Sequence, residues 1–159
     1  MKARYAVLVA IAAAVTVTSV GAAAPEAAKQ RVTITAGGAW NSTSFGKFVL
    51  TPLRAGALKP DSGTETATWT TRDVTRDGQK VVISISVTTL EGKRGTLVIR
   101  QRVEGVGAGN GYEAAIGTWK VVRGTGQYAQ VTGGGGAGWV TAARTRTWSE
   151  SQEGFLTVP

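Results

Sequence analysis

The residues best placed to meet a small molecule are two tryptophans and two polar side chains on predicted strands. Side chains alternate between the two faces of a strand, so Glu65, Trp69, Gln101 and Trp119 each share a face with apolar neighbours. A few polar groups among apolar ones are what orients a ligand in a pocket. We therefore expect these four residues to point inward and to bind a ligand. The simpler alternative is that the rings only fill the core and that the polar groups are satisfied at its ends.

Two residue types that carry much of enzyme chemistry are missing from the chain. The absence of histidine removes the commonest general base and metal ligand, and the absence of cysteine removes thiol nucleophiles, thiolate metal sites and disulfides. We therefore predict no catalytic residues, no metal site and no cofactor. The ten acidic residues leave paired carboxylates for glycoside cleavage as a further hypothesis, because any two strands can bring such side chains together.

The first 24 residues differ from everything that follows. Lys2 and Arg4 precede an apolar run, and small residues follow it, which is the order of a secretory signal peptide. The apolar run is shorter than the roughly 20 residues that a membrane-spanning helix needs, so no permanent membrane anchor is expected. The sequence predicts a signal-peptide helix over 1–24, a mature chain that begins between residues 23 and 29, and a secreted single domain over 25–159.

The charge of the chain favours an acidic partner. Lysine and arginine outnumber the acidic residues and give a net charge of +8, which falls to +6 when Lys2 and Arg4 leave with the signal peptide. An anionic surface polymer suits this balance. The basic residues are scattered, with Lys93 and Arg94 the only adjacent pair, and an exported protein seldom meets nucleic acid. No nucleic-acid partner is therefore expected.

Alternating polar and apolar residues predict strands along the whole mature chain. In the segment 81–88, valine and isoleucine at odd positions alternate with Val82 and hydroxyl side chains at even ones, as in a half-buried strand. The hairpin of this segment with 97–104 is expected to have one apolar face, formed by the odd-numbered residues of both. Asp77-Gly78 and Asn110-Gly111 favour tight hairpin turns. The predicted strands cover residues 31–35, 45–51, 64–74, 81–88, 97–104, 113–122, 137–144 and 146–158.

Eight strands joined by short turns define the expected fold. Neighbouring strands linked in this way pair antiparallel, and a sheet of eight such strands removes its edges by closing on itself. The predicted fold class is therefore all-β, an eight-stranded antiparallel barrel, with a β-sandwich as the alternative. The residues 105–111 are expected to form a flexible connection, and the glycines 133–136 a second break between strands.

The segment GTWKVVRGTGQYAQVTGGG carries a resemblance to a known family. Its Gly124, Thr125, Gly126, Tyr128 and Gly133 are spaced as in a segment of the allene oxide cyclase and dirigent β-barrel superfamily, and of small secreted actinobacterial proteins similar to it. In that superfamily the segment leads from one barrel strand through a tight turn into the next. The resemblance implies an eight-stranded antiparallel barrel around a central cavity. It implies no active-site residues, because the cyclase and dirigent patterns have no match in this sequence.

The segment from Gly124 to Ala129 also fits the dinucleotide-binding pattern G-x-G-x-x-A. That site needs a helix after the glycines and a further parallel strand, whereas here Gly133 follows within seven residues of Gly126. We therefore expect Gly124, Gly126 and Gly133 to be structural, at positions with positive φ or close backbone approach.

Two functions from different classes fit these observations. The first is a secreted, non-enzymatic protein that binds a small apolar molecule or an acidic surface polymer. The second is a cofactor-free cyclase or isomerase that holds an apolar substrate in a reactive conformation inside the barrel. The absence of a recognisable acid, base or nucleophile set favours the first. A barrel filled with side chains would count against the second.

Overall fold

A computed structural model describes residues 28–40 and 44–159 of the chain, and most of them lie in strands. The predicted signal peptide, residues 1–24, lies outside the described residues. Within the described ranges, no helix is long and apolar enough to span a membrane. The elements in order are β1 (Ala28–Trp40), β2 (Ser44–Pro52), β3 (Asp61–Arg76), β4 (Gln79–Gly92), β5 (Gly95–Gly109), β6 (Tyr112–Gly124), the 3-10 helix η1 (Gly126–Tyr128), β7 (Thr132–Ala142) and β8 (Thr147–Val158).

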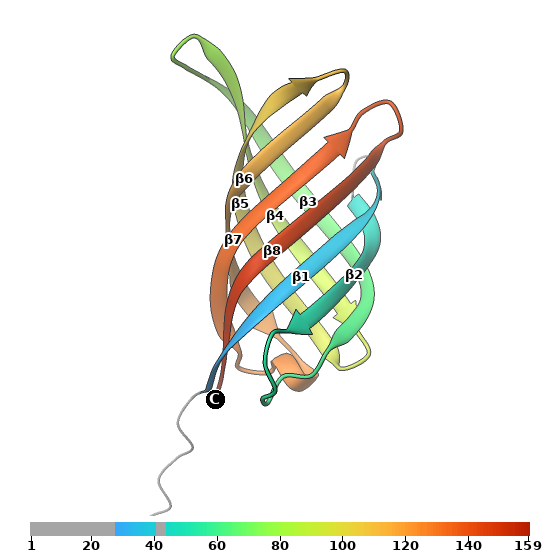
Figure 1. Cartoon of the computed structure of the whole chain (residues 1–159), viewed down its shortest axis with the longest axis vertical. Coiled ribbons are helices and arrows are strands. Elements are labelled where there is room, and N and C mark those ends of the chain that lie inside the picture. Colours follow the sequence, from blue (N-terminus) through green and yellow to red (C-terminus); the bar gives the residue numbers. More distant parts are fainter. Residues whose placement is uncertain (1–27, 41–43) are drawn as a thin grey trace, which may run out of the picture.

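The strands form one closed sheet in which every neighbouring pair is antiparallel. Each strand pairs with the next along the chain, and β1 also pairs with β8, so the ring closes (Figure 1). This confirms the predicted all-β fold of eight antiparallel strands. The strands are tilted, and the C-terminus lies at the lower end in Figure 1, beside the start of β1.

Both predicted hairpin turns are present. Asp77 and Gly78 have φ of +50° and +76°, and Asn110 and Gly111 have φ of +52° and +81°. Two successive positive φ angles match the right-handed twist of the flanking strands, and asparagine, aspartate and glycine tolerate them best. The expected flexible connection over 105–111 is wrong, since β5 continues to Gly109 and β6 starts at Tyr112.

The glycines 133–136 also do not break the chain, because they lie inside β7. Gly135 pairs in register with Trp119 of β6 on one side and with Gly154 of β8 on the other. The indole N–H of Trp119 donates to the carbonyl oxygen of Glu153 on β8, at 3.3 Å, so its ring crosses β7. A residue without a side chain leaves room for that crossing.

The predicted apolar face of the β4–β5 hairpin is wrong. Gly92 pairs with Gly95, and this register sets Ser86 opposite Gln101 and Ile85 opposite Arg102. The even-numbered residues of β4 therefore share the inner face with the odd-numbered residues of β5. A shift of one residue exchanges the two faces of a strand, so the turn, and not the alternation within β4, decided which face points inward.

The hydrophobic core fills the end of the barrel near the C-terminus. We call this the closed end and define it by the connection 53–60, the turn 93–94 and η1. Five leucines of this core are at most 2% exposed: Leu50, Leu58, Leu90, Leu97 and Leu156. We call the opposite end, with the turns at 77–78, 110–111 and 143–146, the open end.

A buried carboxylate ties the closed end together. Asp61 accepts hydrogen bonds from the backbone amide of Lys93, at 3.0 Å, and from the hydroxyl of Tyr128, at 3.0 Å. Tyr128 is fully buried, and this burial raises the pKa of its hydroxyl above the usual range. Gly126, with φ of +58°, turns the chain so that the amide of the next residue donates to Arg94 O, at 2.8 Å. The glycine-rich segment therefore has a structural role at the closed end of the barrel.

Candidate functional site

A cavity of about 180 Å³ occupies the barrel interior between the core and the open end. Thr71 and Glu113 line it and are exposed, so the cavity opens toward solvent beside them. Its wall combines indole rings, carboxyl groups, one amide and several hydroxyls. The lining residues are Trp40, Glu65, Ala67, Trp69, Thr71, Val82, Ser84, Ser86, Thr88, Gln101, Val103, Glu113, Trp139, Thr141, Trp148 and Glu150.

Four of the five tryptophans line this cavity. Each comes from a different strand: Trp40 from β1, Trp69 from β3, Trp139 from β7 and Trp148 from β8. The indole N–H of Trp148 donates to the carbonyl oxygen of Ala39, at 3.2 Å, which holds its ring against β1. Indole rings offer large flat apolar surfaces with electron-rich faces. The wall therefore suits a flat or apolar ligand.

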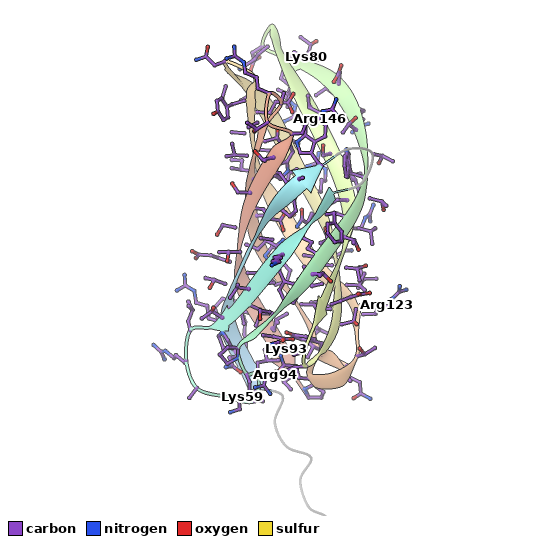
Figure 2. The ribbon with its side chains drawn as sticks, turned by 90° about the vertical axis from the view of Figure 1, so that its right-hand side faces the viewer. Lys59, Lys80, Lys93, Arg94, Arg123 and Arg146 are labelled. Carbon is purple, nitrogen blue, oxygen red and sulfur yellow. The ribbon has the colours of Figure 1, made fainter. Side chains whose placement is uncertain are left out.

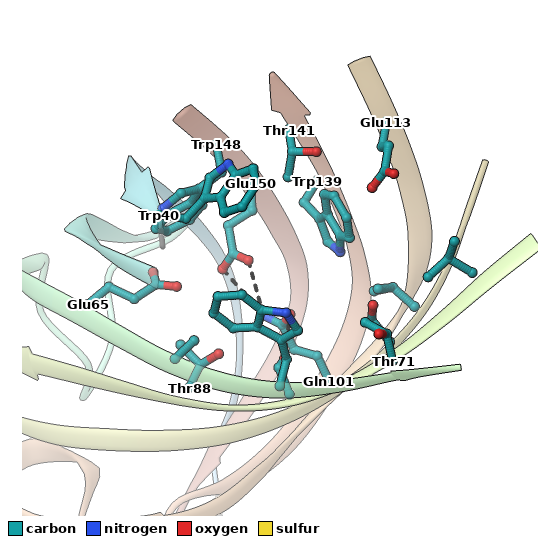
Figure 3. A pocket seen from close by; sticks show the side chains of 16 residues that line it. Trp40, Glu65, Thr71, Thr88, Gln101, Glu113, Trp139, Thr141, Trp148 and Glu150 are labelled. Carbon is teal, nitrogen blue, oxygen red and sulfur yellow. Dashed lines mark hydrogen bonds between the residues drawn. The ribbon is translucent and has the colours of Figure 1, made fainter. Parts of the chain in front are cut away.

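The carboxylate of Glu150 is held by two side-chain amides. Gln101 donates to its two oxygens at 3.3 and 3.4 Å, and Gln152 donates to Oε1. Ser86 in turn donates its hydroxyl to the carbonyl oxygen of Gln101, at 3.3 Å, which fixes the orientation of that amide. In Figure 3, Glu150 lies between Trp148 and Trp139, with its carboxylate directed at Gln101.

Glu65 is the second carboxyl group inside the barrel. It is 1% exposed, and its Oε2 has no hydrogen-bond partner within the described ranges. Burial raises the pKa of Glu65 to about 9, and the nearby Glu150 carboxylate adds to this effect. A charged group removed from water without a partner is unfavourable, so the neutral acid is preferred. Glu65 is therefore protonated at neutral pH.

Glu150 titrates in a different range from Glu65. Burial raises its pKa to about 7, while the hydrogen bonds from Gln101 and Gln152 favour the ionised form and limit the rise. Near neutral pH the pair therefore consists of a protonated Glu65 and a partly ionised Glu150. This is the pattern of environments that separates acid and base roles in a pair of like groups.

Three of the four residues predicted from the sequence to bind a ligand lie in the cavity wall. Glu65, Trp69 and Gln101 line it, with their side chains inside the barrel. Trp119 pairs in register with Gln101 and is 3% exposed, but it belongs to the hydrophobic core and does not line the cavity. A role in ligand binding stays a prediction for all four.

Glu150, which completes the polar part of the site, was not predicted from the sequence. A signal was present in β8, where Trp148, Glu150, Gln152 and Leu156 occupy alternate positions and share one face. The other face of the strand carries Ser149, Ser151, Glu153 and Phe155. The pattern indicates inward polar residues, but it does not say which strand lies opposite.

No group of three or more His, Cys, Asp or Glu side chains in residues 28–40 and 44–159 is placed to hold a metal ion. Fold and site together define a closed antiparallel β-barrel with a cavity at its open end. No protein-family model, no curated protein and no solved structure matches the chain.

Proposed function

We propose that this protein is exported and binds a small, largely apolar molecule in the cavity at the open end of its barrel. The observation that carries the proposal is the wall of that cavity, in which four indoles surround a few oriented polar groups. The order of the first 24 residues supports export. The spacing of Gly124, Gly126 and Tyr128 and the eight-strand order support a place near the allene oxide cyclase and dirigent superfamily.

The size of the cavity limits the ligand to a small molecule or to one end of a longer one. An apolar cavity of about 150 Å³ is known to take up benzene, and this one measures about 180 Å³. A single aromatic ring with one polar substituent therefore fits. The ring contacts the indoles, and the substituent reaches Gln101 or Glu65.

Benzyl alcohol is a neutral probe of this size and tests the proposal. We expect it to change the fluorescence of the tryptophans in a saturable titration, since four of the five rings line the cavity. Ala67→Leu adds bulk to the cavity wall, where Ala67 is 7% exposed, and should weaken binding at least tenfold. Thr68→Leu adds similar bulk to the exposed outer face of the same strand and should leave binding unchanged.

The two variants separate binding in the cavity from contact elsewhere. Equal titrations of wild type, Ala67→Leu and Thr68→Leu would place the probe outside the barrel and contradict the proposal. The proposal is also contradicted if neither benzyl alcohol nor a charged probe of the same shape produces a saturable change in the wild type.

A second candidate function is a cofactor-free cyclase or isomerase, and the carboxyl pair favours it. General acid–base catalysis is most efficient with groups whose pKa lies near the working pH. Glu150, with a pKa of about 7, suits the role of base, and the protonated Glu65 beside it suits the role of acid. In an isomerisation, Glu150 removes one proton from the substrate and Glu65 donates one to it, so the number of protons on the substrate does not change.

The ring opening of 5-nitrobenzisoxazole tests for such a base. A base removes its single ring C–H proton, the N–O bond breaks, and a coloured phenolate with a nitrile forms. If Glu150 is a base, the rate should exceed that of buffer, rise through about pH 7 and vanish in Glu150→Gln. Glu91→Gln, on the exposed outer face of β4, is the matched control. A rate equal to that of buffer would count against an enzyme.

An anionic surface polymer remains a proposed partner for the outside of the barrel. Lys59, Lys93 and Arg94 lie together at the closed end, where Arg94 Nε donates to the carbonyl of Pro60 at 3.0 Å (Figure 2). The double variant Lys59→Gln/Lys93→Gln should elute from immobilised heparin at lower salt than the wild type. Lys80→Gln/Arg146→Gln, at the open end, removes the same charge and should have the smaller effect. An equal decrease in the eluting salt concentration for both variants would indicate that heparin recognises only the net charge of the protein.

A further inference from the structure

The cavity wall is acidic although the chain as a whole is basic. Its acidic residues are Glu65, Glu113 and Glu150, and no lysine or arginine lines it among the described residues. The chain carries a net charge of +8. Lys80, which lies near the open end, pairs with Asp73 at 2.7 Å and does not line the cavity. The interior thus presents negative charge with no basic side chain to balance it.

The indoles surround this negative charge. Trp139 pairs in register with Glu150, and Trp148 precedes Glu150 by two positions on the same face of β8. The faces of indole rings attract cations, most strongly where water is excluded. A carboxylate flanked by indole rings is therefore a site for a positively charged nitrogen and not for an anion.

We propose that the molecule bound in this cavity is an organic amine, with its ammonium group at Glu150 and its apolar part against the indoles. The inference rests on the proposed binding of a small molecule in the same cavity and adds the charge of that molecule. Gln101 and Gln152 hold the Glu150 carboxylate in place before the ligand arrives. Preorganised groups of this kind lose little conformational entropy on binding.

Glu65 supplies a second acceptor for the same ammonium group. Its Oε2 is buried without a hydrogen-bond partner among the described residues, and an acid oxygen accepts a hydrogen bond even when the group is protonated. A primary ammonium has three N–H donors, so it can reach Glu150 and Glu65 together. A ligand with a carboxylate or phosphate at this position would instead meet two carboxyl groups and no basic partner.

A bound cation also changes the protonation of Glu150. A positive charge favours the ionised form of a nearby carboxyl group, so binding should drive a proton from Glu150 into solvent near neutral pH. A neutral ligand of the same shape has no such effect. Proton release is therefore a signature of the ammonium group, independent of affinity.

Three probes of one shape test the inference: benzylamine, benzyl alcohol and benzoate. At pH 7 we expect benzylamine to bind at least tenfold more tightly than benzyl alcohol, and benzoate not to bind. Calorimetric titrations in buffers of different ionisation enthalpy should show proton release with benzylamine alone. At pH 5, below the pKa of Glu150, the preference for the amine should shrink.

Variants assign the preference to Glu150. Glu150→Gln keeps the shape of the side chain and should bring the affinities for benzylamine and benzyl alcohol within about threefold of each other. Glu91→Gln, an exposed position outside the cavity, should keep the full preference.

The probes distinguish this inference from the proposed function on which it rests. Benzyl alcohol that binds as tightly as benzylamine would overturn the inference and leave the proposed function standing. Failure of all three probes would overturn both. Tight binding of benzoate, or a preference for benzylamine that Glu150→Gln retains, would also overturn the inference, because each places the recognition of charge elsewhere. The comparison requires only the wild type and Glu150→Gln, whose side chain has nearly the same volume.

Discussion

The amide of Gln101 on β5 donates to both carboxylate oxygens of Glu150 on β8, at 3.3 and 3.4 Å, across the interior of the barrel. The two residues are 49 positions apart in the chain. This contact joins two strands that are not neighbours in the sheet and keeps a buried carboxylate partly ionised near neutral pH. Glu65, without such donors, stays neutral. The difference in hydrogen bonding therefore gives two like groups different charges.

The carboxyl pair should make the protein less stable as pH rises. In the folded state the pKa values are about 9 for Glu65 and about 7 for Glu150, against an ordinary value of 4.5. Between about pH 4.5 and pH 9 the folded state holds more protons than the unfolded state, so the free energy of unfolding falls with rising pH. Below about pH 4.5 both states are protonated and the effect disappears. Each unit of pKa difference corresponds to about 1.4 kcal/mol, so we expect Tm to fall by several degrees from pH 5 to pH 9.

Variants isolate the contribution of Glu65 to this slope. Glu65→Gln cannot ionise, so it should match the wild type at pH 5 and exceed its Tm at pH 9. Glu91→Gln, exposed on β4, should follow the wild type at both values. A wild-type Tm that rises from pH 5 to pH 9, with Glu65→Gln falling below it, would contradict the assignment of a buried neutral acid.

Gly126→Val should strongly lower stability without direct contact with the cavity. The residue has φ of +58°, and a side chain there would collide with the carbonyl oxygen of Arg94. β-Branched residues rarely adopt this conformation, so we expect a loss of more than 1 kcal/mol in urea unfolding. Gly136→Val is the matched control, since φ at Gly136 is not positive and no atom lies within 4 Å of the added carbon. Equal losses in both variants would contradict a special role of Gly126.

Tyr128→Phe tests the hydrogen bond that ties the closed end. It removes the hydroxyl that donates to Asp61 at 3.0 Å and leaves a buried carboxylate with one donor fewer. Loss of a buried hydrogen bond to a charged group costs about 1.5 to 3 kcal/mol, and we expect a decrease of that order in the free energy of unfolding. Tyr112→Phe removes a hydroxyl from a side chain that is 51% exposed and should be neutral. A neutral Tyr128→Phe would show that backbone amides alone satisfy Asp61.

Features with a local cause could be predicted from the sequence. The turn at Asp77-Gly78 depends on residues that tolerate positive φ, and the dipeptide itself shows this. The inward orientation of Glu65 and Trp69 follows from alternation along one strand, which the structure bears out. In both cases no information from another strand was needed.

Features that depend on two strands could not be predicted in this way. The inner face of β4 carries Ser84, Ser86 and Thr88, because the turn at 93–94 sets the register. Alternation within β4 had favoured the opposite, more apolar face. The contact between Gln101 and Glu150 depends on how the whole ring closes. The polar half of the site therefore emerges only from the complete fold.

Trp69 and Trp119 point into the same barrel and should nevertheless respond differently to truncation. Trp119 is 3% exposed and packs in the core, so Trp119→Ala should cost about 3 to 5 kcal/mol of stability. Trp69 is partly exposed in the cavity wall, so Trp69→Ala should cost less stability and more binding of benzylamine. Urea unfolding and calorimetric titration of both variants measure the two effects.

Acrylamide quenching checks the same assignment in the intact fold. Replacing Trp119 by Phe should leave the quenchable part of the tryptophan fluorescence unchanged, because the buried ring at Trp119 contributes little to it. Replacing Trp69 by Phe should reduce that part, and benzylamine should protect wild-type Trp69 by occupying the space next to it. A Trp119 ring that acrylamide quenches freely would contradict its inward position. A Trp69 ring that benzylamine fails to protect at saturation would show that the probe does not enter the cavity.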